Sequence, residues 1–248
     1  MKYSVVIIAF NESKRIEKLL SSIQGADEIL VVDSNSSDRT SEIAKSFGAR
    51  VIQHDFEGFG QQKQFGVDEA KNEWILSLDA DEVPDPALWK FLEDQNEEDI
   101  PFMAWYLKRY LVFMGRAFRF GKESKDFQLR FFHRKHAQWT TPAVHEKVET
   151  KARTGVLPGK VAHYSFDSID NYLGKFNRYT SLAAEDLVNR GKNRLPLINF
   201  FLIPINFLKF YLLQLNFMNG YAGLCWSVFS SIYPYVKYSK AYDIRRRQ

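Results

Sequence analysis

The sequence predicts an α/β protein with a mostly parallel central sheet, followed by an amphipathic helical extension at the C-terminal end. Short apolar segments alternate with segments of helical periodicity through the first eighty residues. This alternation is typical of parallel strands joined by right-handed helical crossovers. Carboxylates follow two of the apolar segments directly, at Asp33 and Asp79. The carboxyl ends of parallel strands are where such sheets bind ligands.

The composition indicates a globular protein of ordinary size. Its 248 residues are 45% hydrophobic and 26% charged, which is enough for a full core. The single cysteine, Cys225, excludes an intrachain disulfide and fits a reducing compartment. The first residues contain neither a long apolar run nor a small-residue cleavage site. We therefore expect no secretory signal peptide and a cytoplasmic protein.

The first elements follow from their patterns. Residues 3–10 and 28–33 are apolar runs rich in β-branched residues, as expected of buried strands. Between them, apolar residues recur at helical spacing up to Gly25. Asp38 can cap a second helix, which Gly48 ends.

The next elements lead to an acidic loop. Residues 50–53 form a third short strand, and residues 61–71 have a helical pattern. The apolar run 74–78 predicts a buried strand, and the letters D-A-D-E follow it. Pro84 and Pro86 come shortly afterwards, so we expect this acidic stretch to lie in a loop at the carboxyl end of the strand.

The pattern changes in the second half of the chain. Strand-like pieces follow one another, at residues 102–107, 110–114, 117–120 and 126–133. Residues 169–189 return to helical periodicity.

The acidic loop is a candidate metal site. Asp79 and Asp81 are separated only by Ala80, and two carboxylates buried without partners would be very costly. Mg²⁺ or Mn²⁺ is the natural partner of two hard oxygens and a phosphate. A solvated acidic turn is the alternative interpretation of the same residues.

Several common motifs are absent from the sequence. It contains no G-x-G-x-x-G after a strand and no G-x-x-x-x-G-K-[ST], which argues against a dinucleotide-binding Rossmann site and excludes a standard P-loop. The letters H-E-K-V-E at residues 145–149 do not form the zinc-binding H-E-x-x-H motif.

The net charge of +4 conceals an asymmetry between the two halves. Residues 1–100 carry 10 Lys and Arg against 21 Asp and Glu, whereas residues 101–248 carry 24 against 9. A basic second half indicates an anionic partner, such as nucleic acid, a phosphorylated substrate or an anionic membrane surface. The same charge counts would also result if the two halves simply formed differently solvated faces, with no anionic partner.

Residues 195–236 are apolar, with Lys209 as their only charge. Asn, Gln, Pro and Gly interrupt the tract repeatedly, whereas a membrane-spanning helix needs roughly 20 predominantly apolar residues. We expect amphipathic helices that lie in a membrane interface, with the basic residues near the C-terminus, including Arg245–Arg247, against anionic lipid. A packed core helix, a dimer interface and a true span are the alternatives.

Three motifs of the first half, in this order and spacing, resemble the nucleotide-sugar half of family 2 glycosyltransferases, which have the GT-A fold. They are S-V-V-I-I-A-F-N-E (4–12), I-L-V-V-D-S-N-S-S-D (29–38) and W-I-L-S-L-D-A-D-E (74–82). The second half resembles the lipopolysaccharide-core and capsule glucosyltransferase branch of bacteria. The segments that carry this likeness are L-R-F-F (129–132), V-H-E-K-V (144–148), H-Y-S-F (163–166) and the tract 207–224.

The resemblance implies transfer of a sugar from a nucleotide diphosphate donor, with inversion at the anomeric carbon. It also implies that this donor is UDP-glucose, and no residue pattern supports that choice independently. The acceptor would be a hydroxyl of a lipopolysaccharide-core or other lipid-linked glycan, on the cytoplasmic face of the inner membrane. No nucleic-acid partner is implied. Residues 1–100 would bind the nucleotide sugar, residues 101–190 would bind the acceptor and complete the catalytic site, and residues 191–248 would associate with the membrane.

The resemblance also assigns roles to residues. Asp33 would accept a hydrogen bond from the base and Asp79 one from the ribose, while Asp81 would be the direct metal ligand, with Asp79 beside it. A downstream histidine would close the metal shell, with His163 as the first candidate and His145 as the second, and ordinary hydrogen-bonded histidines are the alternative interpretation. The remaining donor contacts would come from Ala9, Asn11, Glu12, Lys63 and Ala80.

The acceptor hydroxyl must lose a proton, so one carboxylate should act as a general base. Glu146 is the first candidate and Asp126 the second. The chain lacks the E-D followed by Q-x-x-R-W of processive synthases, which leaves this assignment open. Arg130 and His145 are candidates for contacts with a phosphate or the acceptor.

Two other functions fit some of these features. A metal-dependent nucleotidyltransferase also uses an acidic loop on an α/β sheet, but A-F-N-E-S-K-R is a poor match to the triphosphate-binding stretch that it needs. A non-catalytic membrane or nucleic-acid scaffold would use the basic half, but it leaves Asp33, Asp79 and Asp81 without a role.

Overall fold

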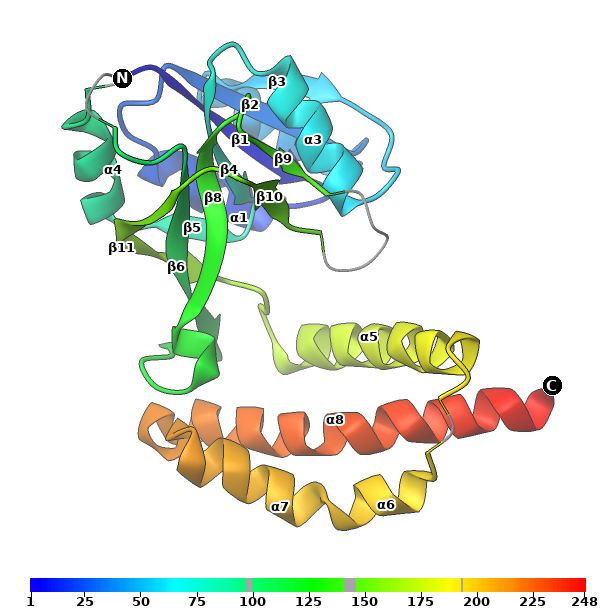
Figure 1. Ribbon diagram of the computed structural model, residues 1–248. Helices are drawn as coiled ribbons and strands as arrows, with labels where there is room; N and C mark the ends of the chain where they lie inside the picture. Colours follow the sequence, from blue (N-terminus) through cyan, green and yellow to red (C-terminus); the bar gives the residue numbers. More distant parts are fainter. Residues whose placement is uncertain (97–99, 141–145, 193) are drawn as a thin grey trace. The chain divides into compact units, whose positions relative to one another are not determined.

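The computed structural model describes residues 1–96, 100–140, 146–192 and 194–248. The chain divides into two compact units (Figure 1). The first unit consists of residues 1–110 and 126–164, and the second of residues 111–125 and 165–248. The functional division predicted at residues 100 and 190 stays a prediction.

The first unit contains most of the strands. Its elements are β1 (Tyr3–Ala9), α1 (Ser13–Ser22), β2 (Glu28–Asp33), α2 (Thr40–Ser46), β3 (Arg50–Gln53), α3 (Phe59–Glu69), β4 (Trp74–Asp79), β5 (Glu82–Pro84), α4 (Pro86–Glu93), β6 (Ala104–Phe113), which runs on into the second unit, β8 (Asp126–His133), β9 (Ala137–Trp139), β10 (Val148–Thr150) and β11 (Thr154–His163).

The main sheet has the strand order β3-β2-β1-β4-β8-β6-β11-β5. The strands β3, β2, β1 and β4 are parallel, as the alternating pattern of the first half predicts. β8 is antiparallel to both β4 and β6, and β5 is antiparallel to β11. The predicted α/β class is therefore confirmed, and the second half of the chain extends the parallel part into a mixed sheet.

Alternate side chains of the parallel strands form a core on each face of the sheet. On one face, Val5 of β1 packs in a cluster with Leu19 of α1 and Leu88 of α4. On the other face, Val6 packs with Val67 of α3. A Cβ on Gly66 would lie 2.5 Å from a Val6 methyl group, so this glycine lets α3 approach β1 closely.

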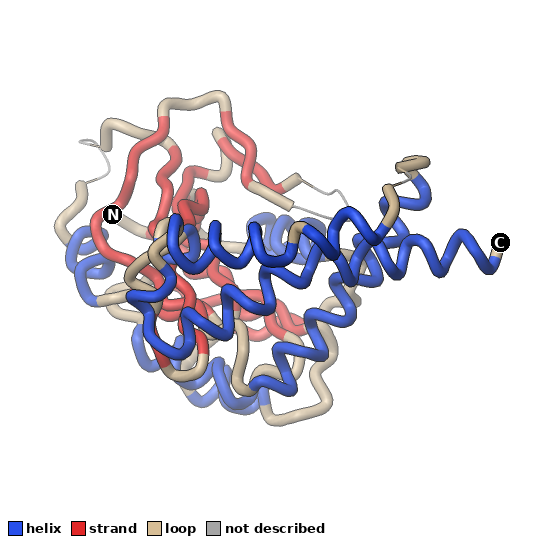
Figure 2. The backbone as a smooth tube through the Cα atoms, turned by 90° about the horizontal axis from the view of Figure 1, so that it is seen from below, coloured by secondary structure: helices blue, strands red, loops and turns tan. Residues whose placement is uncertain are grey.

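The second unit is mainly helical (Figure 2). Its elements are β7 (Arg116–Ala117), a 3₁₀ turn (Lys122–Ser124), α5 (Ile169–Asn189), α6 (Pro196–Phe201), α7 (Ile203–Leu208), a π turn (Lys209–Leu213), a second 3₁₀ turn (Asn216–Asn219) and α8 (Gly220–Arg247). Its core joins the end of β6 to α5 and α8 through Phe113, Phe118, Tyr172 and Ala222.

Helix α5 has the predicted bounds, but two strand predictions differ from the structure. The two strands expected at 102–107 and 110–114 are one strand, β6, with an irregularity of register between Trp105 and Tyr106. The strand expected at 117–120 is only the two-residue β7. No helix within the described residues has the length and apolar character needed to cross a bilayer.

Candidate functional site

The site begins at the carboxyl ends of three neighbouring strands. β1 lies between β2 and β4, with Ala9 opposite Asp33 and Ile8 opposite Asp79. This register brings Asn11, which follows β1, to the same edge of the sheet as the two carboxylates. The buried runs that predicted the strands thus also predicted this edge.

Asp33 and Asn11 hold the turn that follows β2. Asp33 is fully buried, and its carboxylate accepts hydrogen bonds from the Ser36 N–H at 3.2 Å and the Ser41 hydroxyl at 2.7 Å. Asn11 adopts a left-handed backbone conformation with φ of 54°, and its Oδ1 accepts from the Ser37 N–H at 2.9 Å. The two side chains therefore fix the backbone between β2 and α2.

Asp38 links this turn to the first two helices. Its carboxylate accepts from the Thr40 N–H at 2.9 Å and from the Ser13 N–H at 3.1 Å. Its partial burial would raise the pKa, but these hydrogen bonds outweigh that effect and lower the pKa of Asp38 to about 2. The Glu12 N–H donates to the Thr40 hydroxyl at 2.8 Å, so the candidate Glu12 lies in the same network.

A second group of side chains surrounds the end of β4. The Lys63 side chain of α3 is only 4% exposed, and its Nζ lies 3.0 Å from Asp79 Oδ1 and 3.2 Å from Glu146 Oε1. Arg130 of β8 donates from Nη2 to Asp79 Oδ2 at 2.9 Å. Asp79 thus lies between two cations, and Lys63 joins it to the candidate base.

This ionic group continues through Glu82, the residue that begins β5. Glu82 Oε1 accepts from Arg130 Nη2 at 3.0 Å and from Arg109 Nη1 at 2.7 Å. Arg109 also binds Asp126 Oδ2, from Nε at 2.9 Å and from Nη2 at 2.6 Å. The second candidate base therefore belongs to the same network as the D-A-D motif.

The charges shift several pKa values in consistent directions. Burial by itself would raise the pKa of Asp79, but Lys63 and Arg130 outweigh it and hold that pKa well below its usual range. Burial would likewise raise the pKa of Asp126, and Arg109 reverses the effect, so the pKa is lowered. Burial opposes the charge of Arg130, yet Glu82 and Asp79 raise its pKa. All three groups are therefore held in their charged forms.

An aromatic side chain completes the ionic group. Trp139 at the end of β9 is 5% exposed. The Lys63 ammonium lies 4.6 Å from the centroid of its ring, and the Arg130 guanidinium lies 5.3 Å from it. Cations at such distances are attracted by the negative face of an indole ring. Trp139 therefore supports both cations that hold Asp79.

Asp81 pairs with His163 of β11. Asp81 Oδ2 lies 3.4 Å from His163 Nε2, and the two side chains are 15% and 22% exposed. A carboxylate oxygen and an imidazole nitrogen are a donor pair that Mn²⁺ accepts, and Mg²⁺ needs only one or two carboxylates when phosphates supply further oxygens. No group of three His, Cys, Asp or Glu within the described ranges could hold a metal. The pair fits an ion that shares its remaining positions with water and a ligand phosphate.

The predicted residues thus fall into connected sets. Lys63 contacts both Asp79 and Glu146, Arg130 contacts Asp79, and Asp81 is paired with His163. Ala9 and Ala80 are buried in the core behind the strand ends. His145 lies outside the described residues.

Sequence reasoning missed three residues of the site, Glu82, Arg109 and Trp139. Glu82 could have been suspected from its place directly after D-A-D. Arg109 and Trp139 reach the site through antiparallel pairings of the second half, for which the sequence carried no comparable signal.

Comparison with known proteins covers nearly the whole chain. The family described as "Glycosyl transferase family 2" matches residues 4–166. The uncharacterised glycosyltransferase RP128 of Rickettsia prowazekii (strain Madrid E) is 30% identical over 98% of this chain and 87% of its own length. The lipopolysaccharide core biosynthesis glycosyltransferase LpsC of Rhizobium meliloti (strain 1021) is 26% identical over 97% of this chain and 92% of its own length.

A solved structure also resembles the chain. Residues 1–349 of TarS from S. aureus, crystallised with UDP-GlcNAc, align with a TM-score of 0.51 and 17% identity. The alignment covers 100% of this chain and 93% of that one. At this identity, the likeness concerns the fold.

Proposed function

This chain belongs to glycosyltransferase family 2 and has the GT-A fold, and from this premise we propose that it moves a sugar from a nucleotide diphosphate donor to a glycan hydroxyl. The observation that carries the proposal is the ionic group at the end of β4. It joins the D-A-D motif to Glu146 through Lys63, so the proposed donor site and the proposed base are neighbours.

We propose that the nucleotide binds along the ends of β1, β2 and β4. Asn11 and Asp33 stabilise the turn after β2, and this ordered turn would contact the nucleobase. Asp79 is held ionised and would accept from the ribose, a role that carboxylates have in other nucleotide-binding folds. Glucose is the sugar that the sequence resemblance favours.

Transfer would proceed by one displacement. The acceptor oxygen bonds to the anomeric carbon, the bond from that carbon to the phosphate oxygen breaks, and the nucleoside diphosphate leaves with the electron pair. A divalent cation held by Asp81 and His163 would offset the negative charge that develops on the diphosphate. The opposite-face attack implied by this step gives inversion.

The acceptor hydroxyl would give its proton to Glu146. The competing candidate, Asp126, has a lowered pKa and accepts two hydrogen bonds from Arg109 and one from Gln128. A carboxylate with a lowered pKa is a weaker base. Among the residues that the structure describes, Glu146 forms a single ion pair, to Lys63, and it is therefore the better candidate.

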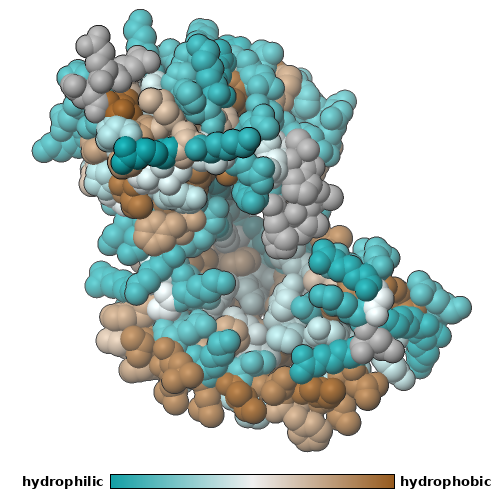
Figure 3. Space-filling view, in the orientation of Figure 1, coloured by the Kyte–Doolittle hydropathy of each residue, from teal (hydrophilic) through white to brown (hydrophobic). Residues whose placement is uncertain are grey.

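We further propose that the acceptor is lipid-linked and that the second unit contacts a membrane surface. Figure 3 shows hydrophobic side chains gathered along α6 and α7. We call this surface, together with the π turn that follows α7, the apolar face. Its exposed large residues include Leu197, Phe201, Ile205 and Leu213, at 60%, 66%, 61% and 80% exposure. Such a face on a short amphipathic segment is typical of helices that lie in a bilayer interface.

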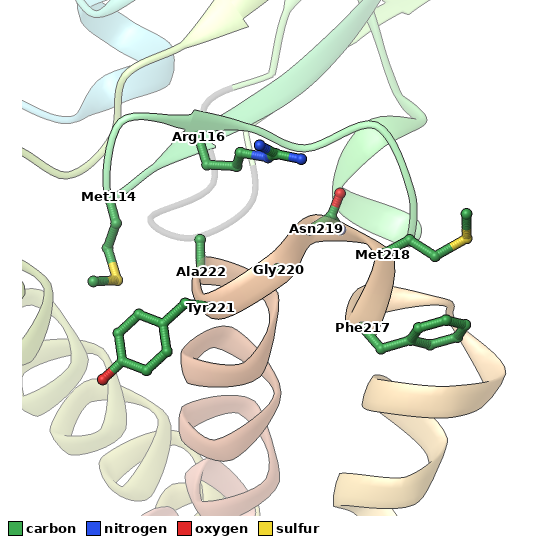
Figure 4. A pocket seen from close by; sticks show the side chains of 8 residues that line it. All are labelled: Met114, Arg116, Phe217, Met218, Asn219, Gly220, Tyr221 and Ala222. Atoms are coloured by element: carbon green, nitrogen blue, oxygen red, sulfur yellow. The ribbon is translucent and has the colours of Figure 1, made fainter.

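The charge of the second unit supports the same partner. Residues 111–125 and 165–248 carry 15 Lys and Arg against 6 Asp and Glu, and anionic lipid attracts such a surplus. A hollow of about 340 Å³ opens where α8 begins, and its lining includes the charged Arg116 together with Met114, Phe217 and Tyr221 (Figure 4). The name of LpsC, a lipopolysaccharide core biosynthesis enzyme, supports a lipopolysaccharide-core acceptor.

A donor screen tests the proposal. The protein would be incubated with a panel of nucleotide sugars and Mn²⁺ or Mg²⁺, with slow donor hydrolysis and thermal shift as readouts. We expect one donor to be turned over, with loss of turnover in the folded variant Asp81→Ala. An identical rate in that variant would refute the role of Asp81, and silence with every donor, even with lipid vesicles present, would refute the proposed reaction.

A further inference from the structure

Glu82 is the most buried carboxylate of the ionic group. Its side chain is 1% exposed, yet it faces two guanidinium groups. It lies three residues after Asp79 and directly after Asp81. None of the steps proposed above uses it, so its burial and its hydrogen bonds require another explanation.

The two carboxylate oxygens of Glu82 have different partners. Oε2 accepts from the backbone N–H of Asp79 at 3.0 Å, which closes the turn from residue 79 to residue 82. Oε1 accepts from Arg109 at 2.7 Å and from Arg130 at 3.0 Å. One side chain therefore fixes both the backbone of the turn and the cations beside it.

Arg130 also stabilises this turn through hydrogen bonds. Its Nη2 atom donates both to Glu82 Oε1 and to Asp79 Oδ2, so it ties the two ends of the turn together. Asp81 lies between these ends, and its carbonyl oxygen accepts from the Tyr164 N–H at 2.8 Å. In the antiparallel pairing of β5 and β11, the backbone of Glu82 lies opposite that of His163. The position of the Asp81–His163 pair thus depends on the strand that Glu82 begins.

We infer that Glu82 is a positioning residue, whose buried carboxylate fixes the turn that carries Asp79 and Asp81. The functional part of this inference rests on the proposed roles of those two residues in binding donor and metal. In metal sites, replacing a group that orients a ligand through hydrogen bonds typically weakens metal binding or activity by about 10- to 100-fold.

The substitution Glu82→Gln separates shape from hydrogen bonding. A carboxylate offers two acceptor oxygens, whereas an amide offers one oxygen and one NH₂ group. In the Glu82→Gln variant, the new NH₂ group would therefore point either at the Asp79 N–H or at the two guanidinium groups. Two donors would then face each other, and one hydrogen bond would be lost. Glu82→Asp keeps the charge but is one methylene shorter, so it cannot span both sets of partners and provides a second variant if Glu82→Gln does not fold.

Glu73 provides a matched control at the opposite end of β4. It also pairs with cations, with Lys135 at 3.0 Å and Arg134 at 3.3 Å, but it precedes the strand and touches none of the proposed ligands. Glu73→Gln therefore removes an ion-paired carboxylate next to the same strand without affecting the turn.

The experiment has two readouts. The first is amide hydrogen exchange at Asp79, compared with Leu76 in the middle of β4, in the protein without ligand. The second is the Kd for UDP with Mn²⁺, by calorimetry. We expect Glu82→Gln to accelerate exchange at Asp79 but not at Leu76, and to weaken UDP binding by about 10- to 100-fold. Glu73→Gln should leave both unchanged.

Each other outcome has a definite meaning. Unchanged exchange at Asp79 would overturn the inference, and faster exchange with an unchanged Kd would reduce Glu82 to a structural residue. If the unsubstituted protein binds no UDP, the proposed donor class is wrong, and the exchange measurement still decides whether Glu82 holds the turn.

Discussion

The Nζ atom of Lys63 lies 3.0 Å from Oδ1 of Asp79, although the two residues come from α3 and β4. The same ammonium lies 3.2 Å from Glu146, so one buried cation connects the two carboxylates to which we assign donor binding and proton removal. Without Lys63, both carboxylates would lose the cation that they share.

Lys63→Met tests this connection, because methionine keeps an unbranched stem of similar length without the charge. Breaking a buried ion pair on one side leaves an uncompensated charge, so we expect a loss of about 3 kcal/mol in the free energy of unfolding. We expect sugar transfer to fall on the order of 10²-fold through misplacement of the carboxylates. Urea unfolding and the transfer rate measure the two effects. The exposed Lys71→Met is the control, and equal effects in both variants would contradict this account.

Asp38→Asn tests the network around the turn after β2. Because the pKa of Asp38 is lowered to about 2 in the folded state, its carboxylate stabilises the fold above the unfolded value of about 3.8. This contribution is lost as the pH falls through about 2. We expect the variant to be less stable at pH 7 by roughly 1–2 kcal/mol. The difference should shrink between pH 4 and pH 2, as followed by urea unfolding, and a constant difference would contradict the shifted pKa.

Glu146→Gln and Asp126→Asn compare the two candidate bases. If Glu146 accepts the acceptor proton, its replacement should lower kcat by about 10²- to 10⁴-fold with little change in the donor KM. Asp126→Asn should act more weakly and through stability, because it loosens Arg109 instead of removing the base. Steady-state transfer assays separate the two effects. A larger loss of kcat in Asp126→Asn than in Glu146→Gln would identify Asp126 as the general base instead of Glu146.

Ile205→Ser tests the apolar face of the second unit. If this face enters a bilayer interface, loss of a side chain that is 61% exposed should weaken binding to vesicles containing anionic phospholipid by about tenfold. Vesicle sedimentation at two salt concentrations measures the effect, and binding should fall with added salt. Val156→Ser changes a residue of the first unit with 57% exposure and is the control. Equal binding by Ile205→Ser and the unsubstituted protein would contradict the proposal.

Much of the first half could be predicted from sequence. Buried parallel strands need apolar residues on both faces, so residues 3–10, 28–33 and 74–78 were recognisable as strands and their ends as a ligand edge. The motifs at these ends also identified the family, which the comparisons confirm.

The partners of the site residues could not be predicted in the same way. Lys63 is buried on α3, the helix that approaches the sheet closely at Gly66, and nothing in the helical pattern indicated that burial. Arg109 and Asp126 meet because β6 and β8 pair in one particular register, with Arg109 opposite Asp126. A shift of one residue would turn such side chains to the other face of the sheet. The apolar patterns of residues 102–114 and 126–133 did not show which residues of the two strands lie opposite one another.

The most direct measurement of the central claim is calorimetric titration of UDP, with and without Mn²⁺, into the unsubstituted protein and into Asp81→Asn. We predict that UDP binds with Mn²⁺ and at least about tenfold more weakly without it, and that Asp81→Asn loses the metal-dependent part while its thermal unfolding stays similar. Metal-independent binding of equal strength in both proteins would contradict the role of Asp81. Absence of UDP binding under all conditions would contradict a uridine nucleotide-sugar donor.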